Sequence, residues 1–566
     1  MLSPYIEQAQ QLIQTVEKRL DDRVTIPFLG KDASLKSVLV GAGVTGYISY
    51  AISKYIVYRL YLHPLNKIPG PPVDWIPLMG NLREVFREES AVPHKRWAEK
   101  YGPIVAYHGP WNEPRIMVTD PDMLKQILMT NVYDYTKTPQ GSQFLARILG
   151  HGLLVTEGTV HRRHRKMLNP AFSIQAIREL TPILFVPPVQ LVEKWMDEIK
   201  AKQTQPDEAV EIVVSHGLSL VTLDEIGLGG FGQEFNAIRN DGTDKVNNLS
   251  WAYQTIFDPS DQQNILTLMT QFFPLLQYLP TQRRYEMDKA LRLLDEESRN
   301  VVHRGIERVH EIKAQGCSPE NHLLSLMIRN SDDETGQGLT AEELRNQCLT
   351  FLAAGHETTA VSLSWCLWLL AKHQDIQDAL RAEITPLFEK INTDDPVFRD
   401  DPFKVGFDGA NLPSFEEINS LHLLNNVCRE AARLIPVVPL TTRYASKDMT
   451  LKQHFIPKGT SIFLPILVNH HNKQIWGEDA EEFKPDRWDQ EPASKVGPYD
   501  YLPFLSGTRM CIGYRFALIE LKIILSILLM KFQYFEKPGF EVKKTQRLTL
   551  RPSPNMTLLV KPVVHQ

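Results

Sequence analysis

The sequence predicts a mainly α-helical fold with a small β part, preceded by one N-terminal transmembrane helix. Helical patterns dominate from Asp120 onwards, and two capping boxes, Thr340–Glu343 and Ser414–Glu417, indicate helix starts. Short runs rich in β-forming residues, 104–107 and 115–119, predict a small sheet near the N-terminus. A helical body with a minor sheet is the class that these signals favour together.

Composition excludes several classes of protein. The chain has 566 residues, of which 43% are hydrophobic and 23% charged, as in ordinary globular proteins. The net charge of 62 − 67 = −5 gives no basic stripe for a nucleic acid. The five cysteines are odd in number and show no C-x-x-C spacing, so neither a disulfide scaffold nor a zinc site is predicted. They are Cys317, Cys348, Cys366, Cys428 and Cys511.

The N-terminal part divides by composition. Residues 1–34 are polar and mildly amphipathic, whereas residues 35–60 are apolar and rich in tyrosine, and form the expected transmembrane anchor. A proline-rich hinge follows at 61–73 and contains Ile-Pro-Gly-Pro-Pro, which ends any helix. The rest of the chain, 74–566, is expected to form the main domain.

The anchor has an alternative interpretation. Gly41–Gly46 fits G-x-G-x-x-G, and Val38–Val40 could be the strand that precedes it in a dinucleotide-binding fold. Such a fold needs an acidic residue about 20 positions later. No Asp or Glu occurs between Lys36 and Val73. We therefore favour the membrane helix, in which the glycines are small residues of a spanning segment.

Three further segments carry structural expectations. Residues 157–173 contain a basic run in which His161 and Arg165 lie four apart, on one face of a helix that could simply be solvated. Gly227–Gly232 is expected to break the helical pattern without forming a phosphate loop, because no G-K-[ST] follows. The acidic, proline-bearing segment 385–412 is expected to be an exposed loop.

The first capping box predicts a helix from Ala341 to about His373, roughly 50 Å long at 1.5 Å per residue. Its middle is apolar except around Glu357 and Thr358. A glutamate and a glycine, Gly355, are both unfavourable in a buried helix, so a function should offset them. We expect Glu357 and Thr358 to deliver protons and Gly355 to admit a flat cofactor or O2. The alternative is that Glu357 is an exposed helix residue.

The second capping box predicts a helix ending near Leu434, with Glu430 and Arg433 at ion-pair spacing. Taken alone, such a pair is usually a surface salt bridge of small value. Arg443 and Arg487 follow in the next segments.

Near the C-terminus the pattern F-x-x-G-x-R-x-C-x-G is filled by Phe504, Gly507, Arg509, Cys511 and Gly513. A lone cysteine here could be a small buried hydrophobe. A thiolate at a helix start, near a cation, is instead stabilised and is a good ligand for iron. The apolar run that follows, 516–530, contains charges and is short, so a buried helix is predicted rather than a second span. The pattern resembles the heme-binding signature of the cytochrome P450 superfamily.

That resemblance covers the chain from the hinge to the Cys511 loop and implies the cytochrome P450 fold, with heme b ligated through its iron by Cys511. The chain has A-G-x-E-T-T at Ala354–Thr359, similar to the family's acid–alcohol motif. The family's W-x-x-x-R is present as His161 and Arg165, without the Trp. The resemblance implies a proton relay through Glu357 and Thr358. It further implies heme contacts by Phe504, Gly507, Arg509, Gly513, Arg165, His161 and Arg443, and a structural lock of Glu430, Arg433 and Arg487.

The implied reaction is insertion of one oxygen atom of O2 into a lipophilic substrate. Only 566 − 511 = 55 residues follow Cys511, too few for a flavin domain. We therefore expect NADPH to act through a separate NADPH-cytochrome P450 reductase, with cytochrome b5 as a second possible donor. The resemblance implies an endoplasmic reticulum membrane protein with one span and a cytoplasmic catalytic domain. Positive charges on either side of the span are balanced and do not fix the orientation.

The anchor junction, YRLYLHPLNKIPGPP, resembles that of fungal members. This suggests biosynthesis of secondary metabolites of terpenoid or polyketide type. The alternatives are a fatty-acid or xenobiotic hydroxylase of the same fold and a heme-thiolate isomerase or dehydratase that uses no reductase. A non-enzymatic heme sensor is a further alternative.

Overall fold

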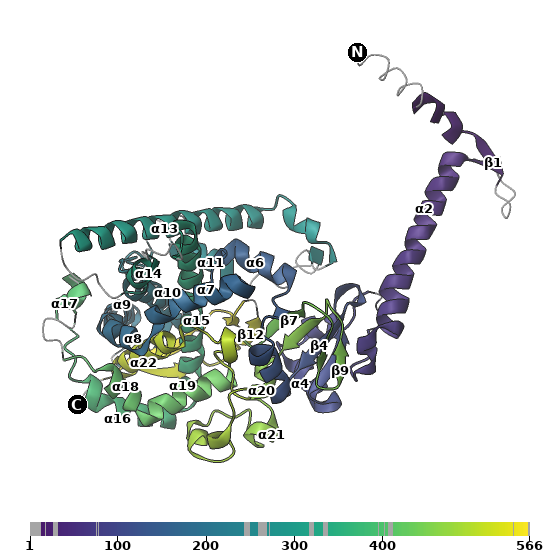
Figure 1. Cartoon of the computed structure of the whole chain (residues 1–566). Helices are drawn as coiled ribbons and strands as arrows, with labels where there is room; N and C mark the ends of the chain where they lie inside the picture. Colours follow the sequence, from purple (N-terminus) through teal and green to yellow (C-terminus); the bar gives the residue numbers. More distant parts are fainter. Residues whose placement is uncertain are drawn as a thin grey trace, which may run out of the picture. The chain divides into compact units, whose positions relative to one another are not determined.

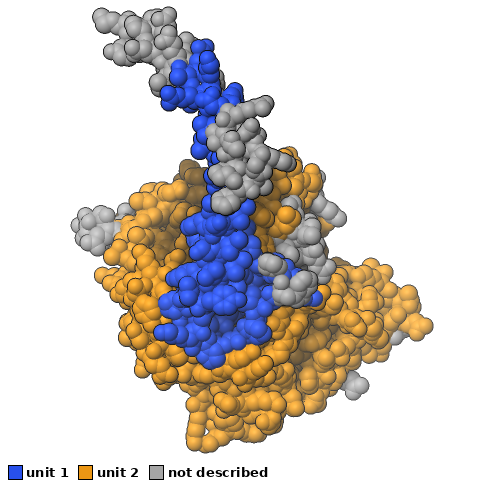
Figure 2. Space-filling view, turned by 90° about the vertical axis from the view of Figure 1, so that its right-hand side faces the viewer, with its two compact units in different colours: residues 1–83, 106–114 blue, residues 84–105, 115–566 orange. Residues whose placement is uncertain are grey.

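We describe the protein from a computed structural model of the whole chain. The described residues are 13–16, 18–25, 32–74, 76, 78–205, 207–242, 249–257, 269–270, 272–315, 322–331, 338–393, 395–400, 402–405, 411–546 and 548–563. The chain divides into two compact units, residues 1–83 with 106–114, and residues 84–105 with 115–566 (Figure 2).

Unit 1 contains the expected anchor. Strands β1 (Arg23–Thr25) and β2 (Asp32–Ser34) pair antiparallel and precede α2 (Leu35–Ile52), whose first turn is capped by Ser34. A π-helical stretch, η1 (Ser53–Leu62), continues the helix, and η2 (Pro64–Lys67) ends it (Figure 1). The helical segment 35–67 contains an 18-residue stretch with a mean hydropathy of 1.3, and none of that stretch is buried. By length and composition it is able to cross a membrane.

The dinucleotide-binding alternative is wrong. Gly41–Gly46 and Val38–Val40 all lie inside α2, so no strand leads into a glycine turn. A Cβ added at Gly41, Gly43 or Gly46 would meet nothing within 4 Å. These glycines lie on an open helix surface and do not shape a ligand loop.

The proline-rich hinge is packed inside unit 1. The Ala106 N–H donates to the Pro69 carbonyl at 3.0 Å, and a Cβ on Gly70 would overlap the Ala106 carbonyl. At the end of the anchor helix, Arg59 donates to the Trp111 carbonyl at 2.8 Å. Residues 106–114 therefore hold both the hinge and the end of the anchor helix, and unit 1 extends past the expected hinge to Arg83.

Unit 2 is mainly helical, in agreement with the predicted class (Figure 1). Its helices of five or more residues are α4 (Val92–Tyr101), α5 (Pro121–Lys125), α6 (Pro139–Leu149), α7 (Gly158–Leu168), α8 (Ile174–Leu180), α9 (Val186–Lys202), α10 (Val214–Glu225), α11 (Leu249–Phe257), α13 (Gln282–Ala314), α14 (Leu323–Ser331), α15 (Ala341–Lys372), α16 (Gln374–Phe388), α18 (Phe415–Ser420), α19 (His422–Leu434), α20 (Ile466–His470) and α22 (Tyr514–Lys531).

The β part is small, and its predicted runs are confirmed as β3 (Ile104–His108) and β4 (Pro114–Val118). Within unit 2 the strand order of the main sheet is β4, β10 (Ser461–Leu464), β7 (Thr441–Ala445) and β5 (Tyr135–Thr136). Ile462 of β10 pairs with Ile116 in parallel and with Arg443 antiparallel. Smaller sheets pair β11 (Phe532–Glu536), β14 (Leu558–Pro562) and β6 (Val210–Ile212), β12 (Lys543–Gln546) with β13 (Leu550–Ser553), and β8 (Met449–Leu451) with β9 (His454–Ile456).

Helix α15 is the central element of the core. Thr340 and Glu343 form the predicted capping box, and the helix ends at Lys372, one residue before the expected end. Most of its length is buried, and it contacts α10, α13, α19 and α22. Helix α22 is buried, as predicted for 516–530. Each fully buried leucine of this core contributes about 1.5–3 kcal/mol.

Three local expectations need correction. The helix expected from Ser414 to Leu434 is broken at Leu421, whose extended ψ of 109° separates α18 from α19. Helix α16 continues through Pro386 to Phe388, so the start of segment 385–412 is helical. Gly227–Gly232 mostly continues α10 as a buried π-helical turn, η7 (Ile226–Phe231), which ends where Gly232 has a φ of +64°.

Candidate active site around Cys511

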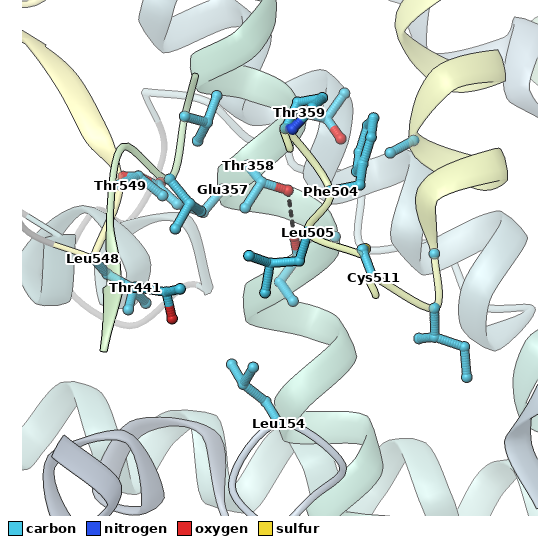
Figure 3. A pocket seen from close by; sticks show the side chains of 18 of the residues that line it. Leu154, Glu357, Thr358, Thr359, Thr441, Phe504, Leu505, Cys511, Leu548 and Thr549 are labelled. Atoms are coloured by element: carbon cyan, nitrogen blue, oxygen red, sulfur yellow. Dashed lines mark hydrogen bonds between the residues drawn. The ribbon is translucent and has the colours of Figure 1, made fainter. Parts of the chain in front are cut away.

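A cavity of about 500 Å³ in unit 2 brings most of the predicted site residues together (Figure 3). Cys511, Glu357 and Thr358 line it, although 153 residues separate Thr358 from Cys511 in the sequence. Its wall is largely apolar. The apolar side chains include Leu145, Leu149, Leu154, Val438, Leu440 and Leu548.

The Cys511 loop is held in an unusual backbone shape. Leu505 and Gly507 have φ values of +57° and +70°, and a Cβ on Gly507 would overlap the Leu128 carbonyl. The glycine at this position is therefore required by sterics. The Cys511 N–H donates to the Phe504 carbonyl at 2.9 Å, which closes the loop before α22 begins at Tyr514.

The surroundings of the Cys511 sulfur differ in part from the expectation. Cys511 is exposed to the cavity, but the protein that encloses the cavity still desolvates the sulfur and raises the pKa of the thiol, while the Gly513 N–H and Arg165 act to lower it. The predicted helix-start donor and nearby cation are thus present, but they do not outweigh burial. The cation is Arg165 and not Arg509. A bound metal ion would supply the remaining stabilisation, since a coordinating thiol is deprotonated outright.

Four cations line the same cavity. Arg165 donates to the Met510 carbonyl at 2.7 Å, and Arg443 donates to the Thr442 carbonyl at 2.8 Å. Arg509 and Lys137 share a single carboxylate, Glu157. Lys137 and Glu157 carry no spacing signal in the sequence, which is why sequence reasoning missed them.

Burial and mutual repulsion among these cations lower the pKa values of several basic groups at the cavity. Burial, then Arg509, lowers the pKa of Arg443 to about 10 and that of Lys137 to about 8. Burial, then the same arginine, lowers the pKa of His161 to about 3, so this histidine is neutral at pH 7. The Nδ1 atom of His161 lies 3.1 Å from the Tyr133 hydroxyl.

This charge balance tests which cofactor the cavity could hold. Glu157 is the one carboxylate paired with these four cations among the described residues, and Glu357, which also lines the cavity, is already bound by Arg551. One carboxylate does not compensate four enclosed cations, and like charges held together are unfavourable. A flat cofactor with two carboxylates and a metal for Cys511 would supply the missing negative charge and the missing cation. The residues present therefore fit heme.

Glu357 is buried and fully paired. It is 1% exposed and accepts from Arg551 Nε at 2.6 Å, Arg551 Nη2 at 2.7 Å and Thr549 Oγ1 at 2.8 Å. Burial raises its pKa, and Arg551 and then Thr549 oppose that rise. Both partners come from the end of the chain, 192 and 194 residues away, and were not predicted. The alternative of an exposed Glu357 is wrong.

Thr358 and Gly355 complete this side of the cavity. The Thr358 hydroxyl donates to the Ala354 carbonyl at 2.7 Å, shown by the dashed line in Figure 3. A Cβ added to Gly355 would come within 2.9 Å of Ile226 Cδ1. The close approach at Gly355 is therefore to the π-helical turn η7, rather than the expected approach of a cofactor or O2 alone.

Glu430, Arg433 and Arg487 lie outside the cavity lining and are buried. Arg433 binds both oxygens of Glu430 at 2.8 Å, and Arg487 Nε donates to Glu430 Oε1 at 3.1 Å. Their remaining N–H groups reach Asp479 and backbone carbonyls. The ion pairs expected from the spacing are present.

Comparisons with known proteins agree with this geometry. The family model described as Cytochrome P450 matches residues 69–560. Cytochrome P450 monooxygenase 205 of Postia placenta is 34% identical, over 91% of this chain and 95% of the relative. Cytochrome P450 monooxygenase sphH of Aspergillus fumigatus is 31% identical, over 91% and 92%. Cytochrome P450 monooxygenase FUM15 of Gibberella moniliformis is 29% identical, over 86% of each chain.

Proposed function

The chain belongs to the cytochrome P450 family, as a heme-thiolate monooxygenase, and on that premise we propose that it inserts one oxygen atom of O2 into a lipophilic compound of fungal secondary metabolism. The observation that supports this most is a single cavity lined by the Cys511 thiol, Thr358 and apolar side chains. Several relatives are fungal monooxygenases, which supports the kind of pathway.

Each proposed contact has a role that its surroundings support. Cys511 would ligate the heme iron, and Arg165, Arg443, Arg509 and Lys137 would bind the heme carboxylates. His161, neutral and close to these cations, adds a hydrogen bond to a carboxylate in place of the family's Trp. Bound heme supplies the activation of O2. The chain supplies the enclosure, the ligand and the protons.

Proton delivery follows from the bonds of Glu357 and Thr358. The Thr358 hydroxyl donates its hydrogen to the Ala354 carbonyl, so its oxygen is able to accept a proton from elsewhere. When it does so, its original hydrogen leaves the Ala354 carbonyl and passes to an acceptor in the cavity. Glu357 accepts from Arg551 and Thr549, so it passes a proton only when one of those donors releases it. We therefore expect Arg551 to control when Glu357 acts.

The spectrum of the reduced, CO-bound protein tests the ligand. Full-length protein should give the red-shifted, thiolate-type Soret band, and Cys511→Ser should lose it. Cys348→Ser is the matched control, because Cys348 is buried and outside the cavity lining, and this variant should keep the band. A thiolate-type band that persists in Cys511→Ser would refute the assignment.

Oxidation of NADPH tests the reaction. With added NADPH-cytochrome P450 reductase, the protein should oxidise NADPH and transfer oxygen from O2 to a lipophilic compound, with or without cytochrome b5. Turnover of a substrate without any reductase would favour the isomerase or dehydratase alternative, and binding without turnover would favour a sensor. Candidate terpenoids, polyketides, fatty acids and xenobiotics are ranked by the spectral shift that each induces.

The anchor supports a location that we propose with the function: a single-pass protein of the endoplasmic reticulum membrane with a cytoplasmic catalytic domain. The helical segment 35–67 supplies the span. Protease treatment of sealed microsomes should degrade unit 2 from the outside. Protection of unit 2 would reverse the orientation.

A further inference from the structure

Two buried acids, Glu225 and Glu520, lie on the other side of α15 from the contact between Glu357 and Arg551. The proton relay through Glu357 and Thr358 does not use them. Glu225 ends α10 and Glu520 lies on α22, and both are 0% exposed. Their carboxyl groups are within hydrogen-bonding reach of each other. Among the described residues, no lysine, arginine or histidine forms an ion pair with either.

The hydrogen bonds of this pair are incomplete if both groups are ionised. The Thr359 hydroxyl donates to Glu520 Oε2 at 2.8 Å. Both oxygens of Glu225 and Oε1 of Glu520 have no donor from another residue. A proton on Glu225 supplies a donor for Glu520 and removes one of two buried like charges. Leaving a buried carboxylate without a donor or a cation is far less favourable.

We infer that Glu225 and Glu520 share a proton and that, through Thr359, they form a second source of protons for the cavity. This second step rests on the proposed function. Glu520 and Thr359 both line the cavity that contains Cys511 and Thr358. Figure 3 shows Thr359 on the turn of α15 that also carries Thr358.

The pair donates only after it has taken up a second proton from water. Glu520 then gives one proton to the oxygen of Thr359, and Thr359 releases its own hydroxyl proton to an acceptor in the cavity. The pair keeps the other proton between its members. Glu520 then accepts from Glu225 and from Thr359, and the structure shows the second of these two bonds. Thr359 is thus a positioning residue between the acids and the cavity.

The electrostatics agree with this geometry. Burial, then the charge of Glu520, raises the pKa of Glu225 well above its ordinary value. Burial raises the pKa of Glu520 to about 7, while its hydrogen bonds with Glu225 and Thr359 oppose the rise. Asp224, next to Glu225, is the further acid that raises the Glu225 pKa, and it accepts from the Ala237 and Ile238 N–H groups.

Infrared spectroscopy of the full-length protein tests the shared proton without turnover. At about pH 8, where an ordinary glutamate is ionised, the wild type should show the carbonyl band of a protonated carboxylic acid, shifted in D2O. Glu225→Gln should remove this band, and Glu520→Gln should shift it. Absence of the band in the wild type, or its persistence unchanged in both variants, would overturn the inference.

Two controls assign the band and one assay tests its use. Asp224→Asn and Glu357→Gln should leave the band in place, and its loss in either would place the proton elsewhere. With reductase and NADPH, Thr359→Val should raise the peroxide released per NADPH by about twofold or more, because a proton source is lost. An unchanged ratio with the band intact would refute the second step alone. A wild type that oxidises no NADPH would refute the proposed function and leave the shared proton standing.

Discussion

Two clusters of charged residues in unit 2 differ in how fully their cations are paired with carboxylates. Behind the cavity, Glu430 and Asp479 balance Arg433 and Arg487, and the N–H groups of the arginines reach carboxylates or backbone carbonyls. Around the cavity, Arg165, Arg443, Arg509 and Lys137 have Glu157 as their one paired carboxylate among the described residues. The balanced cluster is complete within the chain. The unbalanced cluster is the one for which we propose a ligand that brings carboxylates.

This difference gives a physical basis for the division that the resemblance implies, in which Arg433 belongs to a structural lock and Arg443 is proposed to bind the heme. Arg433 and Arg443 are ten positions apart, and both are buried. Arg433 makes two bonds to Glu430, whereas Arg443 bonds only to Thr441 and the Thr442 carbonyl among the described residues. The partners, and not burial, distinguish the two.

The largest expected effect is that of Arg433→Met. Removing this arginine leaves Glu430 as a buried charge whose remaining donors are Arg487 and the Lys484 N–H, which costs about 3–5 kcal/mol. Unfolding of the full-length protein in urea, followed by tryptophan fluorescence, should show a drop of that size. A loss below about 1 kcal/mol would mean that the balanced cluster is no lock.

The matched substitution Arg443→Met should act on the cofactor instead. It removes a charge-assisted hydrogen bond to a heme carboxylate, so heme affinity should fall by about tenfold to a hundredfold. The free energy of unfolding without heme should change by about 1 kcal/mol or less, because repulsion with Arg509 is relieved as two weak bonds are lost. Release of heme to an acceptor protein measures the first quantity. Equal losses of stability in Arg433→Met and Arg443→Met would show that the two arginines do not differ in their structural role.

Lys137 adds a dependence on pH. Its pKa is about 8 in the folded protein and 10.5 ordinarily, so the folded state holds fewer protons than the unfolded state between these values. The stability of the heme-free protein should therefore rise as the pH increases from about 8 to 10.5, while heme affinity falls. Lys137→Met should remove this contribution to both slopes. Both slopes are measured by following the free energy of unfolding and the rate of heme release as a function of pH. Slopes that are the same in Lys137→Met and the wild type would show that Lys137 is not the titrating group.

The smallest effect is expected for His161→Phe. The substitution keeps a flat ring beside Tyr133 and removes one neutral hydrogen bond, worth about 0.5–1.5 kcal/mol. Heme release should accelerate by less than about tenfold. A loss as large as that of Arg443→Met would place His161 among the main contacts of the cofactor.

The sequence predicted those parts of the site that follow a spacing. Cys511, Thr358, Glu430 and the helix from Ala341 were all identified from local patterns, since a motif fixes residues within one loop or helix. Arg551, Lys137 and Glu225 were not, because they meet their partners through tertiary packing across as many as 295 positions. The break at Leu421 and the π-helical turn η7 also lack a local signal, and propensity alone does not place them.

The route of the chain through unit 1 has a consequence for truncation. Residues 106–114 belong to the same compact unit as the anchor, so the polypeptide leaves that unit at Arg83, re-enters it at Ala106 and leaves again after Pro114. A soluble form that begins at residue 74 would strip the Ala106 N–H and the Trp111 carbonyl of their partners at Pro69 and Arg59. A start between Ile52 and Tyr55 removes α2, the larger part of the apolar helical segment, and retains both bonds. A truncation is therefore better placed inside the helix, N-terminal to the proline-rich hinge at 61–73.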